Sequence, residues 1–246
     1  MIDSSFVEKI IKESQTTTVQ IGGKDYSSRP VYNAPREEIP LPKALGVSTL
    51  TAVLDYIFSG QAEAKELFLH VESPTTVRVF GKLDALAQRA CYLKAEACTK
   101  TLQLNRWMQP DSFIVNLMAG CVDNDDSDKM TVLAYVGNIT EEHVKKTRDD
   151  GVTQGATVKT GITLTDTVEC PNPVNLQPYR TFTEVDQPIS KFVLRLQDGP
   201  EAALFEADGG AWQVEAIQRI SEFLNNALLK VQDDLKEAGL RVTVLA

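Results

Sequence analysis

The sequence lacks any run of about 18 consecutive apolar residues, and no basic stretch followed by an apolar segment opens the chain. A membrane-spanning helix needs the first feature, and a secretory signal needs the second. We therefore expect a protein that is not secreted, makes no membrane contact and acts in the cytoplasm.

Basic residues are fewer than acidic ones, 25 against 34, which gives the 246-residue chain a formal net charge of −9. Sequence-independent binding of nucleic acid depends on clustered lysine and arginine side chains. The composition argues against such binding over the whole surface, and a local basic patch remains an alternative.

Cysteine is scarce, and no two cysteines are spaced as a CxxC pair. This spacing fits neither a zinc ribbon nor a redox motif. We expect free thiols at all four positions: Cys91, Cys98, Cys121 and Cys170.

Patterns of catalytic and cofactor sites are also missing. The two histidines, His70 and His143, would have to supply any histidine-based device, and no serine lies in a GxSxG context. The acidic run Asp123–Asp128 does not match a calcium loop, because Asp128 and Ala134 stand where glycine and glutamate are needed. We predict no catalytic residue, no metal and no cofactor, and we expect no enzymatic activity.

Three groups of residues are candidates for contacts with anions or nucleic acid. The densest basic set is Lys145, Lys146, Arg148 and Lys159. Arg106 and Trp107 are adjacent and form a candidate pair for stacking on a single strand. Gly209 and Gly210 lie between an expected strand and an expected helix, where backbone amides bind anions or the glycines simply allow a sharp turn.

The most regular part of the chain is its last third. Alternation predicts strands at 191–197 and 202–206, and a three- to four-residue apolar repeat predicts a helix from Ala211 to Glu237 that ends near Gly239. We expect this helix to pack across the hairpin and bury Trp212, Phe223 and Leu228, with a closing strand at 240–245.

The preceding chain is predicted to contain shorter elements. Helices are expected at 1–15, from a cap at Ser48 or Thr49 to Gly60, at 110–120 and from Thr140 to Arg148. Strands are expected at 67–72, 76–80, 89–97 and 130–136, and a helix is the alternative for 89–97. A threonine-rich ribbon with a turn at Gly161 is expected within 149–175. Turn formers fill 20–45, which is typical of an extended arm.

These elements predict an α+β protein with a mainly antiparallel sheet and a long C-terminal amphipathic helix. Residues 1–45 form an N-terminal helix and proline-rich arm in this interpretation, and residues 46–246 form the body. Pro171, Pro173 and Pro178 mark an internal boundary near 171–178.

Three stretches resemble a known protein family: DDGVTQGATVKTGI (149–162), PNPVNLQPYRTFTEVDQP (171–188) and ALFEADGGAW (203–212). They are similar to the YfdQ-like family of bacteriophage and prophage proteins, whose function is unknown. The resemblance extends from about Leu50 to the end of the chain. It implies a phage-borne gene that acts in the cytoplasm of the host bacterium, and it brings no catalytic residue with it.

We therefore expect a non-enzymatic phage accessory protein that acts through protein–protein contacts with an unknown phage or host protein. A homo-oligomer is expected because apolar terminal helices, extended arms and exposed ribbons often exchange between subunits. The alternatives are a nucleic-acid accessory factor in phage replication or recombination, and an inhibitor of a host defence system.

Overall fold

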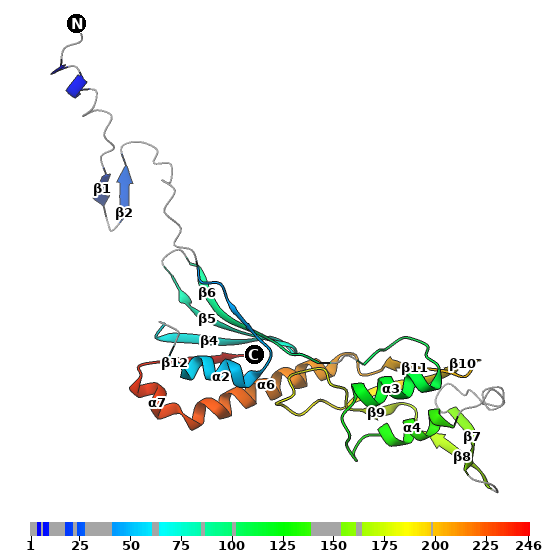
Figure 1. The fold of residues 1–246 in the computed structure, drawn as a ribbon. Coiled ribbons are helices and arrows are strands. Elements are labelled where there is room, and N and C mark those ends of the chain that lie inside the picture. Colours follow the sequence, from blue (N-terminus) through cyan, green and yellow to red (C-terminus); the bar gives the residue numbers. More distant parts are fainter. Residues whose placement is uncertain are drawn as a thin grey trace. The chain divides into compact units, whose positions relative to one another are not determined.

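The computed structural model describes residues 4–5, 7–9, 18–21, 24–27, 41–60, 64–84, 87–99, 102–138, 154–160, 164–197 and 199–246 (Figure 1). Contacts divide the chain into two units, Met1–Leu41 and Pro42–Ala246. In the first unit, residues 4–5 and 7–9 are helical, and strands β1 (Thr18–Ile21) and β2 (Lys24–Ser27) pair antiparallel. The region expected to be an extended arm therefore carries part of a hairpin, because residues 18–27 can pair across two intervening glycines.

The second unit contains a five-stranded sheet with the order β12-β4-β5-β6-β3. The hairpin β4 (Glu66–Ser73) and β5 (Thr76–Leu83) and the next strand, β6 (Arg89–Glu96), pair antiparallel as predicted. At the two edges, β12 (Arg241–Leu245) is parallel to β4 and β3 (Leu45–Val47) is parallel to β6. The α+β class is confirmed, and this sheet is mixed rather than antiparallel throughout.

Three helices accompany this sheet: α2 (Leu50–Phe58), α6 (Ala211–Lys230) and α7 (Gln232–Glu237). Of the two predicted caps, Ser48 and Thr49, it is Thr49 that caps α2, since its Oγ1 accepts a hydrogen bond from the Ala52 amide at 3.2 Å. Together the sheet and helices bury one cluster, called the five-strand core here: Leu50, Val53, Leu54, Ile57, Leu67, Leu69, Val71, Val77, Val79, Leu93, Ala95, Phe182, Val185, Ile220, Leu224 and Leu228.

The long C-terminal helix exists, but its packing differs from the expectation. Ile220, Leu224 and Leu228 lie in the five-strand core, so α6 packs on β4 and β12 and not across the hairpin that precedes it. Trp212 and Phe223 are only half-buried. The predicted single helix is also interrupted at Val231, which separates α6 from α7.

A second cluster lies around two short helices and a three-stranded sheet. Helices α3 (Pro110–Gly120) and α4 (Lys129–Gly137) pack with β9 (Val174–Leu176), β10 (Ser190–Gln197) and β11 (Glu201–Glu206), whose order is β11-β10-β9. Their shared buried residues are called the α3–α4 core here: Leu102, Met108, Phe113, Leu117, Cys121, Val132, Tyr135, Val136, Cys170, Val174, Leu176, Phe192, Leu194, Ala202 and Leu204.

The strand predicted at 130–136 is wrong, because this stretch forms α4. Val132, Tyr135 and Val136 are buried at helical spacing against α3. The helix expected from Thr140 to Arg148 lies outside the described residues. Strands β7 (Gln154–Thr160) and β8 (Leu164–Cys170) form the expected antiparallel ribbon, and Gly161 lies outside the description.

Residues 177–189 join the two cores. Phe182 and Val185 are part of the five-strand core, and Glu184 Oε1 accepts the Leu50 amide at 2.7 Å at the start of α2. Gln187, only 4 % exposed, donates and accepts hydrogen bonds within the same segment. The boundary predicted at 171–178 is therefore followed directly by buried chain. None of the described helices has the length and apolar character needed to cross a bilayer.

Candidate functional site

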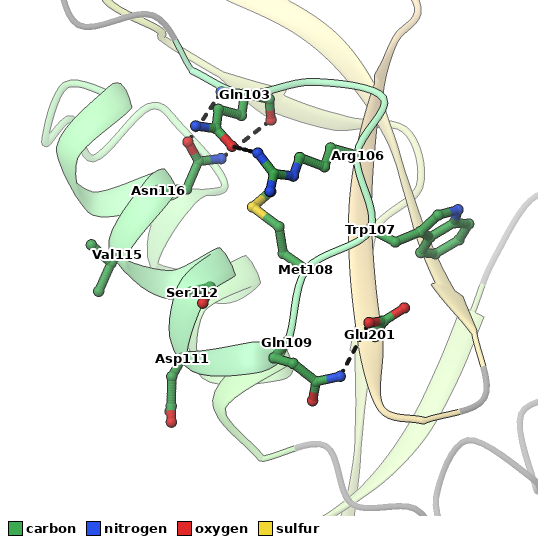
Figure 2. A pocket seen from close by; sticks show the side chains of 10 residues that line it. All are labelled: Gln103, Arg106, Trp107, Met108, Gln109, Asp111, Ser112, Val115, Asn116 and Glu201. Carbon is green, nitrogen blue, oxygen red and sulfur yellow. Dashed lines mark hydrogen bonds between the residues drawn. The ribbon is translucent and has the colours of Figure 1, made fainter.

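A groove of about 680 Å³ lies between α3 and the segment that runs along β11 (Figure 2). This segment extends the small sheet, because Asn105 donates to the Leu204 carbonyl at 2.8 Å and Met108 pairs with Ala202. Most side chains around the groove are polar. The residues that line it are Gln103, Arg106, Trp107, Met108, Gln109, Asp111, Ser112, Val115, Asn116 and Glu201.

Amide side chains fix both ends of the groove. The Asn116 side-chain oxygen accepts a hydrogen bond from the backbone amide of Gln103 at 3.0 Å. Its side-chain nitrogen donates to the backbone carbonyl of Gln103 at 3.2 Å. Gln109 donates to Glu201 Oε1 and to the Gly199 carbonyl, both at 3.1 Å. The sequence singled out Arg106 and Trp107 of this groove, whereas isolated glutamines and asparagines carry no sequence pattern and were not predicted to take part. Its polar walls are suited to hydrogen-bonding partners such as peptide groups.

The structure places Arg106 and Trp107 on opposite sides of their segment (Figure 2). Arg106 reaches toward the α3 side of the groove, and its Nη1 donates to Oε1 of Gln103, a residue of the same segment, at 3.2 Å. Trp107, 37 % exposed, packs its edge on Phe205 with ring centroids 6.0 Å apart. Neighbouring residues of an extended segment point in opposite directions. The two side chains therefore do not present one continuous stacking surface.

The other predicted contacts are not brought together with Arg106. Lys145, Lys146 and Arg148 lie outside the described residues, and Lys159 is a β7 residue paired with Thr165. Gly209 and Gly210 have φ values of 63° and 81° and precede α6, as the sharp turn requires.

Asp208 already occupies the Gly210 amide and the first amide of α6. Its Oδ1 accepts the Gly210 amide at 3.0 Å, and its carbonyl accepts the Ala211 amide at 3.3 Å. A carboxylate at the start of a helix is favourable there and repels a second anion. This geometry fits the turn better than an anion site.

Arg180 links the two parts of the second unit. Its guanidinium lies 4.9 Å from the Phe192 ring centre and 4.7 Å from that of Trp212, and Nη1 is 2.7 Å from Glu206 Oε1. The Arg180 side chain is 9 % exposed. Cation–π contacts of a desolvated arginine are stabilising, so this stack fastens the start of α6 to β10.

The buried thiols are poor nucleophiles. Burial raises the pKa of Cys121 and of Cys170 to about 12, and it also raises the pKa of Tyr135. The nucleophile in cysteine chemistry is the thiolate, which these two residues do not form near neutral pH. All four cysteines are free, as predicted, and no cluster of three metal-ligating side chains occurs in the part of the chain that the structure describes.

Three large apolar side chains of the α3–α4 hairpin face solvent, and we call them the apolar patch. Val115 and Met118 on α3 are 62 % and 58 % exposed, and Met130 on α4 is 71 % exposed. Helices α3 and α4 pack on each other, and the three side chains lie outside the core that the helices share. Large apolar side chains left in solvent on neighbouring helices are candidates for contact with another protein.

Comparison with protein-family models, with curated proteins and with solved structures finds no match to this chain.

Proposed function

We propose that this chain is a non-enzymatic phage accessory protein that acts through protein–protein contacts in the cytoplasm of the infected bacterium, as a homo-oligomer. The observation that carries the proposal is the apolar patch of Val115, Met118 and Met130. The phage context rests on the YfdQ-like stretches of the sequence.

The fold does not need these three side chains in its interior. The core is already filled by Phe113 and Leu117 of α3 and by Val132 and Tyr135 of α4, all of which are fully buried. Removing exposed apolar surface from water is favourable by about 25 cal/mol per Å². Methionine is flexible and adapts to a partner surface. The patch is therefore suited to burial against another protein.

A second copy of this chain is the partner that we propose for the patch. A two-fold symmetric contact uses the same surface on both subunits, so an apolar surface serves as its own complement. A copy also carries the same charge of −9, which makes an uncharged contact surface the favourable place for association. An unrelated phage or host protein is the competing occupant.

Light scattering coupled to size-exclusion chromatography tests this proposal at micromolar concentration. The wild-type chain is expected at a multiple of 27.1 kDa, and a variant with Val115→Ser, Met118→Ser and Met130→Ser is expected at the single-chain mass. The matched control replaces two other exposed apolar residues, Val214 and Leu229 of α6, with serine and is expected to keep the wild-type mass.

A monomeric wild-type chain would overturn self-association. An unchanged mass in the triple variant would show that the apolar patch is not the contact. Circular dichroism of each variant shows whether the fold is retained.

A further inference from the structure

One face of the five-stranded sheet is covered and the other carries aromatic and charged side chains. Helices α2 and α6 lie on the same side of the sheet (Figure 1), where they pack on the buried residues of β4 and β5. Along β4 the buried residues Leu67, Leu69 and Val71 alternate with Phe68, His70 and Glu72, which therefore point to the opposite side.

Two phenylalanines stand next to each other in the middle of that opposite face. Phe68 of β4 and Phe80 of β5 are direct cross-strand partners, and both are half-buried. Such partners have Cβ atoms about 5 Å apart. The His70 ring lies 6.3 Å from the Phe80 ring, and the Arg89 guanidinium lies 5.1 Å above the Phe68 ring. The result is a row of flat groups on adjacent strands.

Cations surround these rings. Arg78 is the cross-strand partner of both His70 and Lys94, so the three residues share this face. Lys82 forms an ion pair with Glu66 at 3.8 Å, which places it on the same side, and the Arg89 contact with Phe68 does the same. Arg78, Lys82, Arg89 and Lys94 thus lie on this face close to the carboxylates of Glu66, Glu72 and Glu96, and Arg241 of β12 is the cross-strand partner of Glu66. Cations outnumber carboxylates here, in a chain whose total charge is −9.

An ion pair of this face is exchangeable. Arg78 Nε lies 2.8 Å from Glu72, whose side chain is 41 % exposed, and Lys94 contacts Glu96, whose side chain is 63 % exposed. Ion pairs exposed to solvent contribute little free energy, about 0–1 kcal/mol. A phosphate group is therefore able to replace Glu96 as the partner of Lys94, while the Arg78 side chain, 34 % exposed, keeps its Nε buried beside Glu72.

We propose that this sheet face binds single-stranded nucleic acid, with one base stacked on Phe80, a second base replacing the Arg89 guanidinium over Phe68, and phosphates held by Arg78, Lys94 and the displaced Arg89. Sheets with exposed aromatic residues on neighbouring strands bind unpaired bases in this way, and base–aromatic stacking tolerates any sequence. A duplex is not a suitable ligand, because its bases are already stacked on each other. The site is separate from the apolar patch, so it does not depend on self-association.

Fluorescence anisotropy of the full chain with a labelled single strand of about 20 nucleotides, as oligothymidylate and as oligouridylate, tests the proposal. We expect saturable binding of at least one strand at low salt. The logarithm of the association constant is expected to fall linearly with the logarithm of the salt concentration, with a slope of about −0.7 for each phosphate contact. A DNA duplex of equal length is expected to compete at least about tenfold less well, since it offers only phosphates. The two single strands distinguish DNA from RNA as the ligand.

Variants of the two rings distinguish stacking from general effects. Phe68→Leu and Phe80→Leu are each expected to lower the affinity about tenfold, while Phe68→Tyr and Phe80→Tyr keep it within a few-fold, because tyrosine retains the stacking ring. The control is Phe58→Leu, a phenylalanine of α2 that is 44 % exposed on a different element, and it is expected to bind as wild type.

Glu72→Gln frees Arg78 and is expected to tighten binding. Absence of binding to both single strands at low salt overturns the proposal, and so does equal binding by the leucine variants, provided that their circular dichroism matches wild type. Tighter binding of the duplex than of either single strand also overturns it. The binding measurements do not depend on the mass found by light scattering. The failure of this proposal is therefore distinguishable from the failure of self-association.

Discussion

Lys129 is a buried cation that holds the chain between α3 and α4. Its side chain is 4 % exposed, and its Nζ donates to the Cys121 carbonyl at 2.7 Å and to Asp123 Oδ1 at 2.5 Å. Asp128 acts nearby, since its Oδ2 accepts the Asn175 amide at 2.7 Å. The acidic run Asp123–Asp128 forms a loop, as its composition predicts, and the contacts of Asp123 and Asp128 hold that loop in place.

We predict that Lys129→Met lowers the free energy of unfolding by about 1–3 kcal/mol, because the buried Cys121 carbonyl loses its donor. Asp123→Asn is the matched comparison. The Asp123 side chain is 91 % exposed, so the loss of its charge is expected to cost less than about 1 kcal/mol. Urea unfolding followed by circular dichroism measures both, and equal losses in the two variants would contradict the assignment.

At the scale of single elements, the end of α7 follows a known local rule. Gly239 has a φ of +66°, its amide bonds to the Lys236 carbonyl at 3.0 Å, and the Leu240 amide bonds to the Leu235 carbonyl at 2.9 Å. These two bonds define a Schellman motif, which needs a left-handed residue after the helix. The sequence predicted this cap correctly because the requirement is local.

We predict that Gly239→Ala lowers the free energy of unfolding by about 1 kcal/mol, because a side chain disfavours the left-handed conformation. Crowding does not contribute, as no atom lies within 4 Å of the added Cβ. Gly46→Ala is the control, since Gly46 has the same empty surroundings and no positive φ in the left-handed range. Thermal unfolding of the two variants checks the difference, and equal midpoints would contradict it.

Helix α4 shows where reasoning from single elements fails. The stretch MTVLAYVG is short, apolar and rich in β-branched residues, which favours a strand. A short apolar run does not distinguish a buried strand from a buried helix. The partner decides: α3 contacts this stretch and buries Val132, Tyr135 and Val136. Tertiary packing overrides the local preference here, and the sequence contains no signal for that partner.

For the whole molecule, the hydrophobic stripe of α6 was predictable, but the sheet on which it packs was not. The hairpin β10–β11 directly precedes α6, and sequential elements are usually neighbours. Instead the helix buries Ile220 and Leu224 on a sheet formed much earlier in the chain, and β12 then pairs parallel to β4. A strand pattern does not state the direction of pairing. The candidate sites depend on such pairings, so the sequence named Arg106 and Trp107 but not the Phe68–Phe80 pair.

The two hydrophobic cores are joined through residues 177–189, where Gln187 makes most of the polar contacts. Its Oε1 accepts the Arg180 amide at 2.9 Å and the Thr181 amide at 3.1 Å, while Nε2 donates to the Phe182 carbonyl at 3.0 Å. The Gln177 side chain also donates to the Gln187 carbonyl at 2.7 Å. This network links the strand β9 side of the molecule to the segment that inserts Phe182 into the five-strand core.

We predict that wild-type residues 42–246 unfold in one cooperative transition and that Gln187→Leu separates it into two. Leucine fills a similar volume but leaves buried backbone amides and carbonyls without partners, at a cost of at least about 2 kcal/mol. Hydrogen exchange along a urea gradient, compared between β10–β11 and β4–β5, measures the coupling. The control is Gln232→Leu, an exposed residue of α7 that is expected to leave a single transition. If Gln187→Leu keeps the two sheets exchanging together at the wild-type midpoint, the link between the cores is made by the apolar contacts of Phe182 and Val185 and not by Gln187.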